Sequence, residues 1–359
     1  MSKIKNYFPG GNTPEGFYSF YQYLPYYAEK LYILKGGPGT GKSTFMKKIG
    51  YELNEAGYDI EFHWCSSDNN SLDGIVIPKL ELAFLDGTTP HMTDPVFPGA
   101  IDEIINLGRF WDNKILEENK SDIVYLTELI SHRFKQAYSY LKSAKTIYLH
   151  WKKYYQKSQD KNSYKQLVNR LISKNIIKRN IQHGTERHLF ASAITPEGSV
   201  NYLENLSEEI NNRIVIKGKP GTGKSALIKD FCYEAAKYGY HILYLHCPLA
   251  PEELDAAIIP ELDTALLVAT PPHYLEVNKT TDQTINLVET INLDYIKDYN
   301  AEILDAEKLY EDMMKRVYYF LKSAKSIHDD LEEYYIRAMD FDKIDMYRKD
   351  LIRNFIKKT

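Results

Sequence analysis

The chain has 359 residues and a formal net charge of -4. This length allows two domains, and the small net charge excludes a protein whose whole surface attracts nucleic acid or acidic membranes. The sequence contains no signal peptide and no apolar run near the ~18 residues of a membrane helix, so we expect a cytoplasmic protein without membrane insertion. The three cysteines lack C-x-x-C spacing, which argues against a zinc cluster or a disulfide framework.

The predicted elements of the first half alternate between strands and helices. In chain order they are a short strand ending at Tyr7-Phe8, a helix start at 13–16 with Thr13 as N-cap and Pro14 as first helical residue, a strand over 31–34, a glycine-rich loop, a helix over about 44–56, a strand ending at Cys65 and a strand near 80–86. This alternation predicts an α/β fold with a mainly parallel sheet flanked by helices.

The same elements recur in the second half at an offset of 182 residues. Between 35–91 and 217–273, 25 of the 57 positions are identical. Beyond His91 the offset becomes 180, which places a two-residue difference in a loop. The chain is therefore predicted to be a tandem duplication with two similar domains.

Each half carries a G-x-x-x-x-G-K-[ST] motif between a predicted strand and a predicted helix. In such a loop the glycines let backbone N–H groups turn toward phosphate oxygens, the lysine reaches the β- and γ-phosphates, and the Ser hydroxyl binds Mg²⁺. The pattern predicts ATP and Mg²⁺ as ligands, although a preference for ATP over GTP stays open. The predicted nucleotide-binding residues are Gly36, Gly37, Pro38, Gly39, Thr40, Gly41, Lys42, Ser43 and Thr44, and Gly218, Lys219, Pro220, Gly221, Thr222, Gly223, Lys224, Ser225 and Ala226; Lys42 is also predicted to be catalytic, and Ser43 and Ser225 to be metal ligands.

The two halves differ where a metal-positioning carboxylate is expected. Residues 82–86 have the form of a Walker B strand, whose apolar residues are buried and whose final residue, Asp86, would position the metal and serve catalysis. Val268 stands at the equivalent position of the second half. We therefore predict catalysis at the first site and binding or slow turnover at the second. In the alternative interpretation, Asp86 only caps a turn with Gly87.

Asp73 and His91 are the candidates for activating water or sensing the γ-phosphate, because no glutamate follows Asp86. Both recur in the second half, as Asp255 and His273. A carboxylate or imidazole at the carboxyl ends of strands would face a ligand bound there. In the alternatives, Asp73 caps a helix and His91 holds a loop.

Each half is predicted to end in a long helical hairpin, over about 121–180 and 300–357, packed against the α/β core or against the opposite hairpin. A break near 181–187 defines the predicted domains, 1–183 and 184–359. Residues 151–180 carry nine basic side chains and one acidic one. A surface for RNA, DNA or an acidic protein is one interpretation of this stretch, and a solvated helix face is the favoured one.

The two loops resemble those of the P-loop NTPase superfamily, including AAA-type and RecA-like ATPases and some small kinases. More closely, the chain resembles a little-characterised bacterial family of tandem P-loop proteins described only as ATPases or nucleotide kinases. The resemblance covers nearly the whole chain and rests on both loops and on the stretches 86–91, 94–99 and 105–112. It implies nucleotide binding and leaves the substrate open.

Three functions fit these features. The first is a Mg²⁺-dependent ATPase, a hydrolase whose nucleotide cycle changes how the helical hairpins meet an unknown macromolecular partner. The second is a small-molecule or nucleotide kinase, which is disfavoured because Arg109 is the only arginine within 66–113 to line a lid. The third is a non-catalytic, nucleotide-gated binding protein.

Overall fold

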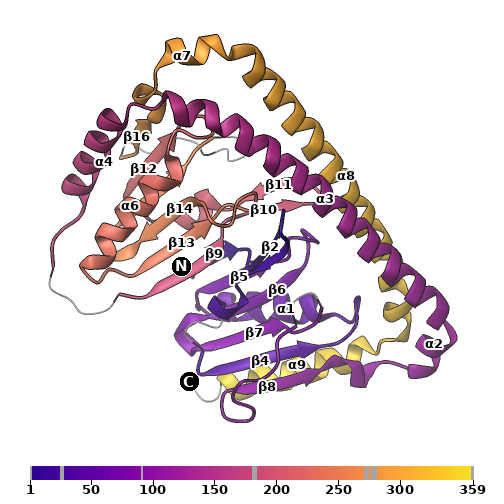
Figure 1. Cartoon of the computed structure of the whole chain (residues 1–359). Helices are drawn as coiled ribbons and strands as arrows, with labels where there is room; N and C mark the ends of the chain where they lie inside the picture. Colours follow the sequence, from indigo (N-terminus) through magenta and orange to yellow (C-terminus); the bar gives the residue numbers. More distant parts are fainter. Residues whose placement is uncertain are drawn as a thin grey trace.

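The computed structural model describes residues 2–24, 28–89, 92–179, 184–270, 275 and 281–356. It contains two six-stranded sheets, one in each half of the chain, and two small two-stranded ribbons. The two sheets lie next to each other, and two long helices run side by side past both of them (Figure 1).

The first sheet has five strands that run in one direction and one that runs against them. Its order is β1 (Ile4–Tyr7), β5 (Ile60–Trp64), β6 (Leu72–Ile77), β7 (Leu82–Asp86), β4 (Lys30–Lys35) and β8 (Asp102–Asn106). The reversed strand is β6, which pairs antiparallel with both neighbours. The predicted α/β architecture with mainly parallel strands is confirmed.

The second sheet repeats this arrangement. Its order is β9 (Glu186–Phe190), β13 (Ile242–His246), β14 (Leu254–Ile259), β15 (Thr264–Val268), β12 (Asn212–Lys217) and β16 (Gln283–Asn286), with β14 reversed. The duplication seen in the sequence is therefore also a duplication of topology. The strands β6 and β14 were not predicted, because an Asp near the start of each and the Pro that follows are atypical of strands.

The prediction of a helix start at 13–16 is wrong. These residues form the turn of a hairpin between β2 (Gly10–Thr13) and β3 (Gly16–Ser19), and the second half repeats it with β10 (Ser192–Thr195) and β11 (Gly198–Asn201). The Thr13 hydroxyl accepts a hydrogen bond from the Glu15 N–H and donates one to the Gly16 carbonyl. Gly16 has φ 104°, a conformation that ends any helix. A Thr-Pro pair serves this turn as well as it serves a helix N-terminus.

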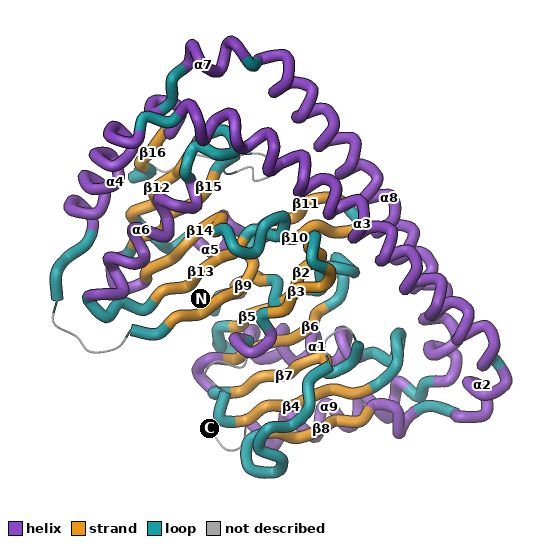
Figure 2. Tube along the Cα trace, in the orientation of Figure 1, coloured by secondary structure: helices purple, strands orange, loops and turns teal. Residues whose placement is uncertain are grey.

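The predicted helices after the loops are confirmed as α1 (Lys42–Glu55) and α6 (Lys224–Lys237). The later helices are α2 (Asn113–Glu118), α3 (Lys120–Ser158), α4 (Lys161–Asn175), α5 (Leu203–Ser207), α7 (Leu293–Asp298), α8 (Asn300–Ala338) and α9 (Phe341–Ile356); short 3-10 turns lie at Tyr21–Tyr23, Pro78–Leu80, Leu107–Phe110, Pro260–Leu262 and Leu287–Thr290. In Figure 2, α4 and α6 lie beside the second sheet and α1 and α9 lie beside the first.

The two predicted helices of each half are confirmed, and α3 packs against α8 of the opposite half, but the hairpin arrangement is wrong, because the last helix of each half covers the sheet of the other half. In Figure 1 the magenta α4 lies among the orange elements of the second half, and the yellow α9 lies among the indigo and purple elements of the first. Val168 and Leu171 of α4 belong to the core that contains α6. Ile344 and Ile352 of α9 belong to the core that contains α1.

The length of α3 and α8 explains this exchange. Each helix has 39 residues, which is roughly 58 Å at 1.5 Å per residue. A helix of that length carries the chain beyond its own sheet, and α3 packs along α8 on the way. The predicted domains 1–183 and 184–359 each contain one sheet, but each sheet is completed by a helix from the other domain.

The two halves meet about a pseudo-twofold axis between the sheets. Phe8 and Phe190, which are 182 residues apart, exchange two backbone hydrogen bonds of 2.9 and 3.0 Å. The side chain of Asn12 donates to the carbonyl of Ile194, its own equivalent, at 2.9 Å. Both side chains of the Phe pair are buried in a shared apolar core. The contact between the halves is thus built from equivalent positions.

One buried ion pair breaks this symmetry. The Arg187 guanidinium donates two hydrogen bonds, of 2.9 and 2.7 Å, to the Glu61 carboxylate, and His63 lies 3.4 Å from the same carboxylate. Burial alone would raise the pKa of the Glu61 carboxyl, but Arg187 and His63 outweigh it and hold that pKa well below its usual range. Burial lowers the pKa of His63, against the opposing effect of Glu61.

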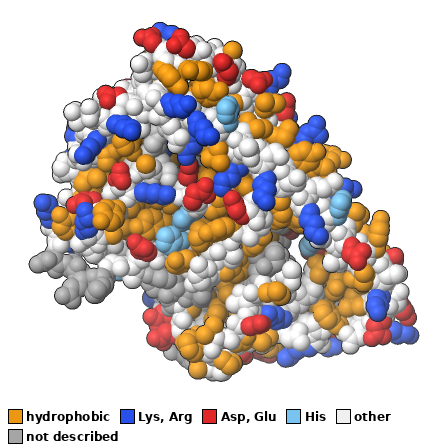
Figure 3. All heavy atoms as spheres, viewed as in Figure 1, with side chains coloured by type: hydrophobic (Ala, Val, Ile, Leu, Met, Phe, Trp, Pro, Cys, Tyr) orange, Lys and Arg blue, Asp and Glu red, His pale blue; other side chains and the backbone are white. Residues whose placement is uncertain are grey.

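The outer surface carries both charge signs. Figure 3 shows basic and acidic side chains interspersed over the face in view. Within the described part of the chain, every helix lacks the sustained apolar stretch that a bilayer-spanning segment requires.

The helix exchange predicts a specific cross-link. Lys48 of α1 and Asp345 of α9 form an ion pair of 3.0 Å, so the double variant Lys48→Cys/Asp345→Cys should join the two ends of one chain with a short bismaleimide. The readout is a mobility shift of the monomer on a denaturing gel.

Lys165 holds the position equivalent to Asp345 in α4, so Lys48→Cys/Lys165→Cys is the matched control. Cross-linking of the control pair instead would show that each helix stays with its own half.

The buried cluster at the interface predicts an acid-sensitive fold. Because the folded-state pKa of His63 is lowered, its contribution to stability is complete above the unfolded value of about 6.5 and declines below it. The Glu61 contribution is complete above about 4.3 and is lost at still lower pH. Urea unfolding between pH 7 and 5 should therefore show falling stability, and His63→Gln should flatten that slope. The same change at exposed His132 should not; an unchanged slope in His63→Gln would contradict this account.

Candidate functional site

The two glycine-rich loops join the carboxyl ends of central strands to helix N-termini. One connects β4 to α1 and the other connects β12 to α6. Gly41 and Gly223 cap the helices with φ of 85° and 92°, in the left-handed region that favours glycine. The Thr40 hydroxyl donates to the Gly37 carbonyl at 2.8 Å, which ties the loop back on itself. The backbone N–H groups of such a loop can surround an anion.

Each loop lysine lies over its own loop. The Lys42 ammonium donates to the carbonyls of Gly36 and Gly37 at 3.1 and 2.8 Å. Lys224 makes the equivalent bonds, to Gly218 and Lys219, at 2.8 and 2.9 Å. Burial lowers the pKa of Lys224 to about 8. Both ammonium groups are thus placed where a phosphate held by the loop would replace the carbonyls as partner.

The Ser hydroxyls are held by the reversed strands. The Ser43 Oγ accepts a 2.9 Å hydrogen bond from the Leu72 N–H at the start of β6, and Ser225 does the same with Leu254 of β14. A hydroxyl has a second lone pair and a proton to spare after this bond. The reversed strands, which the sequence analysis missed, therefore position the predicted metal-binding hydroxyls.

Asp86 caps its own turn and also lies beside the lysine of the first loop. Its Oδ1 accepts hydrogen bonds from the N–H and hydroxyl of Thr88, at 2.9 and 2.5 Å, and so caps the turn. Its Oδ2 lies 3.7 Å from the Lys42 ammonium. Because β7 pairs parallel with β4, the last residue of the one strand lies beside the loop that follows the other. In the second half the buried Val268 occupies this place.

Asp73 lies on β6 at the same edge of the sheet, and its alternative role as a helix cap is wrong. Since β6 is antiparallel to β7, its first residues lie beside the last residues of β7, next to the Gly74–Leu85 pair. The side chain is buried with those of Tyr21 and Cys65. Burial, and then the Asp73 charge, raises the pKa of the Cys65 thiol well above its usual range. Deprotonation of the Cys65 thiol is therefore disfavoured.

Two other candidates from the sequence have different outcomes. His91 and its equivalent His273 fall outside the described residues. Arg109 stacks its guanidinium on the rings of Phe110 and of Tyr347 in α9, at 4.8 and 5.0 Å from their centres. It thus helps to hold the exchanged helix α9.

The first loop is covered by α8 of the other half. The Gly39 N–H donates to Oε1 of Glu332 at 3.1 Å. The Tyr335 ring lies so close to Gly37 that a Cβ there would be 2.4 Å from it. The sequence analysis missed both residues, because nothing in a local pattern tells which loop a distant helix will cover.

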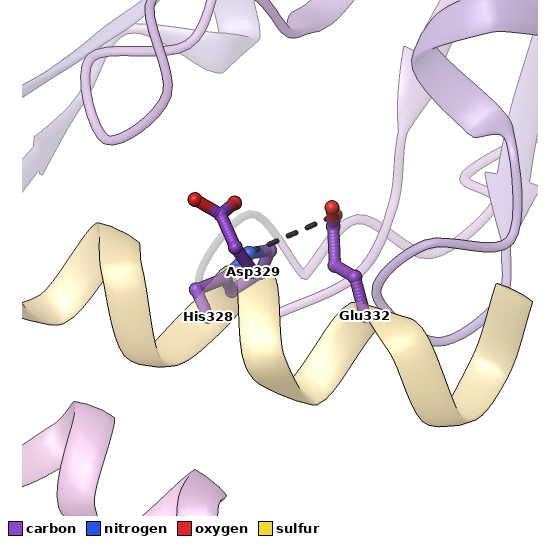
Figure 4. A group of neighbouring side chains, drawn as sticks. All are labelled: His328, Asp329 and Glu332. Carbon is purple, nitrogen blue, oxygen red and sulfur yellow. Dashed lines mark ion pairs between the residues drawn. The ribbon is translucent and has the colours of Figure 1, made fainter.

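Glu332 also belongs to a small cluster on α8. His328, Asp329 and Glu332 have ligand-type atoms within 4.8 Å of one another. Figure 4 shows Asp329 and Glu332 on the same side of the helix, with the ion pair of 3.7 Å between His328 and Glu332 drawn as a dashed line. Partly exposed groups of this kind commonly occur without an ion, and Glu332 is already bonded to the loop.

The second loop is covered by α3 and α4 of the first half. The Gln159 side chain donates to the Thr222 carbonyl at 2.8 Å, and the Tyr164 hydroxyl donates to the Gly223 carbonyl at 3.0 Å. The backbone of Lys152 lies against Gly221, and its ammonium pairs with Glu253. Each loop is therefore roofed by helices from the opposite half.

A cavity of 1110 Å³ lies between the second loop and the long helices. Its walls include Tyr148, Trp151 and Lys152 of α3 and Glu307, Tyr310 and Met314 of α8. Small-molecule sites commonly have volumes of about 300–1,000 Å³. The space is large enough for a nucleoside triphosphate.

Because α8 covers the first loop, two Gly→Ala changes should lower the free energy of unfolding by different amounts. Gly39 and Gly57 both have positive φ, at 68° and 95°, which costs a substituted Ala about 1–2 kcal/mol. A Cβ at Gly39 would also lie 2.8 Å from the Glu332 carbonyl, whereas one at Gly57 meets nothing within 4 Å. Gly39→Ala should lower the free energy of unfolding more than Gly57→Ala by about 1–3 kcal/mol, measured with urea. Equal losses would argue against the roof.

Comparisons with protein-family models, curated proteins and solved structures found no match. The case for the chemistry of the site therefore rests on the loop geometry, the paired Lys42 and Asp86, and the residues that roof each loop.

Proposed function

We propose that this chain binds ATP with Mg²⁺ at its phosphate loops and hydrolyses it at the first loop. The observation that carries this proposal is the 3.7 Å approach of the Asp86 carboxylate to the Lys42 ammonium at the mouth of the first loop. A lysine for the phosphates and a carboxylate for the metal are the two charged groups that such loops require. The second loop keeps the lysine but has Val268 in place of the carboxylate, which favours binding over turnover.

The residues at the first loop fit both ligands. Gly39 already donates its N–H to a carboxylate, which stands in for an anionic phosphate oxygen. The hydroxyl of Ser43 and the Oδ2 of Asp86, which faces Lys42, are oxygen ligands of the kind that Mg²⁺ prefers. When bound, Mg²⁺ would neutralise charge on the phosphates.

The chain's own groups would divide the work. Lys42 would exchange its carbonyl partners for phosphate oxygens, and Ser43 and Asp86 would hold the metal. Asp73, at the same sheet edge, and His91 are the candidates for orienting water. The roof formed by α8 would exclude bulk water and strengthen the electrostatic interactions beneath it.

The long helices α3 and α8 are the elements through which nucleotide binding would change the surface offered to a partner. The first half of α8 lines the cavity at the second loop, and its last turns cover the first loop. A change at either loop therefore bears on the same helix pair, α3 and α8. We propose this pair as the surface that presents the nucleotide state to a macromolecular partner, with a nucleic acid as the less favoured kind.

Radiolabelled ATP tests the function and its alternatives. We expect free phosphate, with Asp86→Asn lowering kcat by roughly 100-fold or more and Lys42→Ala lowering it more than Lys224→Ala does. Label transferred to an added nucleoside monophosphate would favour the kinase, and binding without any product would favour the gated binding protein. The matched variant Val268→Asp should raise turnover at the second loop if a carboxylate there is what is lacking. Equal effects of the two lysine variants would contradict the assignment of catalysis to the first loop.

A further inference from the structure

The two long helices place opposite charges at equivalent positions of the two loops. In the repeat, Lys152 of α3 corresponds to Glu332 of α8, with the offset of 180 residues that holds in this part of the chain. Gly221 likewise corresponds to Gly39. The backbone of Lys152 lies against Gly221 as that of Glu332 lies against Gly39. The same position of the repeat thus carries a lysine at one loop and a glutamate at the other.

At the first loop the carboxylate takes the place of a ligand. Glu332 accepts the Gly39 N–H at 3.1 Å, and this N–H belongs to the set that would surround phosphate oxygens. The Tyr335 ring lies against the neighbouring Gly37. A triphosphate must displace both side chains, and Glu332 would also repel its negative charge at short range.

At the second loop the same position favours an anion. Lys152 lines the cavity together with Lys219 and Lys224. Its ion pair with Glu253 keeps its ammonium within the cavity wall. Three lysines from the two halves of the chain therefore line the cavity at the second loop, where Glu253 and Glu307 pair with two of them.

We propose that Lys152 raises, and Glu332 lowers, the affinity for nucleoside triphosphate at the loop that each covers. The second loop then binds triphosphate first, and Glu332 blocks the first loop until α8 moves. This inference rests on the proposed function, since it requires that the loops bind triphosphate at all. It deepens that function, because the loop with the catalytic carboxylate is then the one that is closed at rest.

The helix α8 connects triphosphate binding at the second loop to the opening of the first loop. Tyr310, Met314 and Tyr318 of α8 line the cavity at the second loop. Glu332 lies 14 residues after Tyr318 on the same helix, roughly 21 Å along its axis. A triphosphate in the cavity would contact the helix that carries Glu332, so filling of the second loop would change access to the first.

Two tryptophans give a separate signal for each loop. Trp151 lines the cavity at the second loop, and the Trp111 ring lies 6.0 Å from the Tyr335 ring that covers the first loop. In a Trp64→Phe background, removing one or the other leaves a single reporter. Titration with Mg²⁺ and a non-hydrolysable ATP analogue should saturate the Trp151 signal at a concentration at least tenfold lower than the Trp111 signal.

Charge-neutral variants test the two residues. Glu332→Gln should tighten binding at the first loop at least tenfold, and Lys152→Gln should weaken binding at the second at least tenfold. The exposed neighbours provide matched controls, Glu333→Gln on α8 and Lys153→Gln on α3, and these should leave both affinities within about twofold. Calorimetry on the Lys42→Ala protein gives the second-loop affinity without any tryptophan change, and calorimetry on the Lys224→Ala protein gives the first-loop affinity while the second loop is empty.

The outcomes separate this inference from the function beneath it. Equal affinities at the two loops, or a Glu332→Gln protein with an unaltered first site, would overturn the inference and leave nucleotide binding intact. If no variant binds the analogue at either loop, the proposed function fails, and the inference fails with it.

Discussion

The structure depends on two 39-residue helices, α3 and α8, that pack along each other and are each too long to stay with one sheet. Because a helix is rigid over this length, the chain that leaves one sheet can turn back only when it has reached the other. The following helices, α4 and α9, therefore complete the core of the opposite half. Neither half has its full apolar core without the other, so we expect the two to fold as one cooperative unit.

The exchange also brings the two halves' chemistry together. A loop in an isolated α/β domain would open to solvent, whereas here Glu332 and Tyr335 cover the first loop and Gln159 and Tyr164 cover the second. The duplication gave the two loops equivalent surrounding positions, and later substitutions changed the charge at some of these positions. In the function that we propose, the difference between Asp86 and Val268 affects metal binding, and the difference between Glu332 and Lys152 affects phosphate binding. Both differences favour unequal roles for two loops of nearly identical sequence.

Sequence patterns failed where one pattern serves two structures or where the partner lies far away. The Thr13-Pro14 pair suits both a helix N-terminus and a hairpin turn, and only the positive φ of Gly16 separates the two. The strand β6 was missed because Asp73 and Gly74 are atypical of strands, although both of its neighbours in the sheet bury it. The hairpins were wrong because helical periodicity shows which face is apolar but not which core that face will enter.

Local structure around the two glycine-rich loops, by contrast, was predictable from the residue order. The strand, loop and helix of each follow from short-range constraints, namely glycine at positive φ, apolar runs that fill a strand, and a lysine and serine at fixed spacing. The duplication, too, was evident from the amino-acid sequence alone. The direction of β6 and β14, the exchange of α4 and α9, and the opposite charges over the two loops emerged only in three dimensions. Each of these depends on which surfaces bury each other in the folded chain, at separations of up to 293 residues between Gly39 and Glu332. That choice is made by packing free energy summed over the whole core, which no short segment encodes.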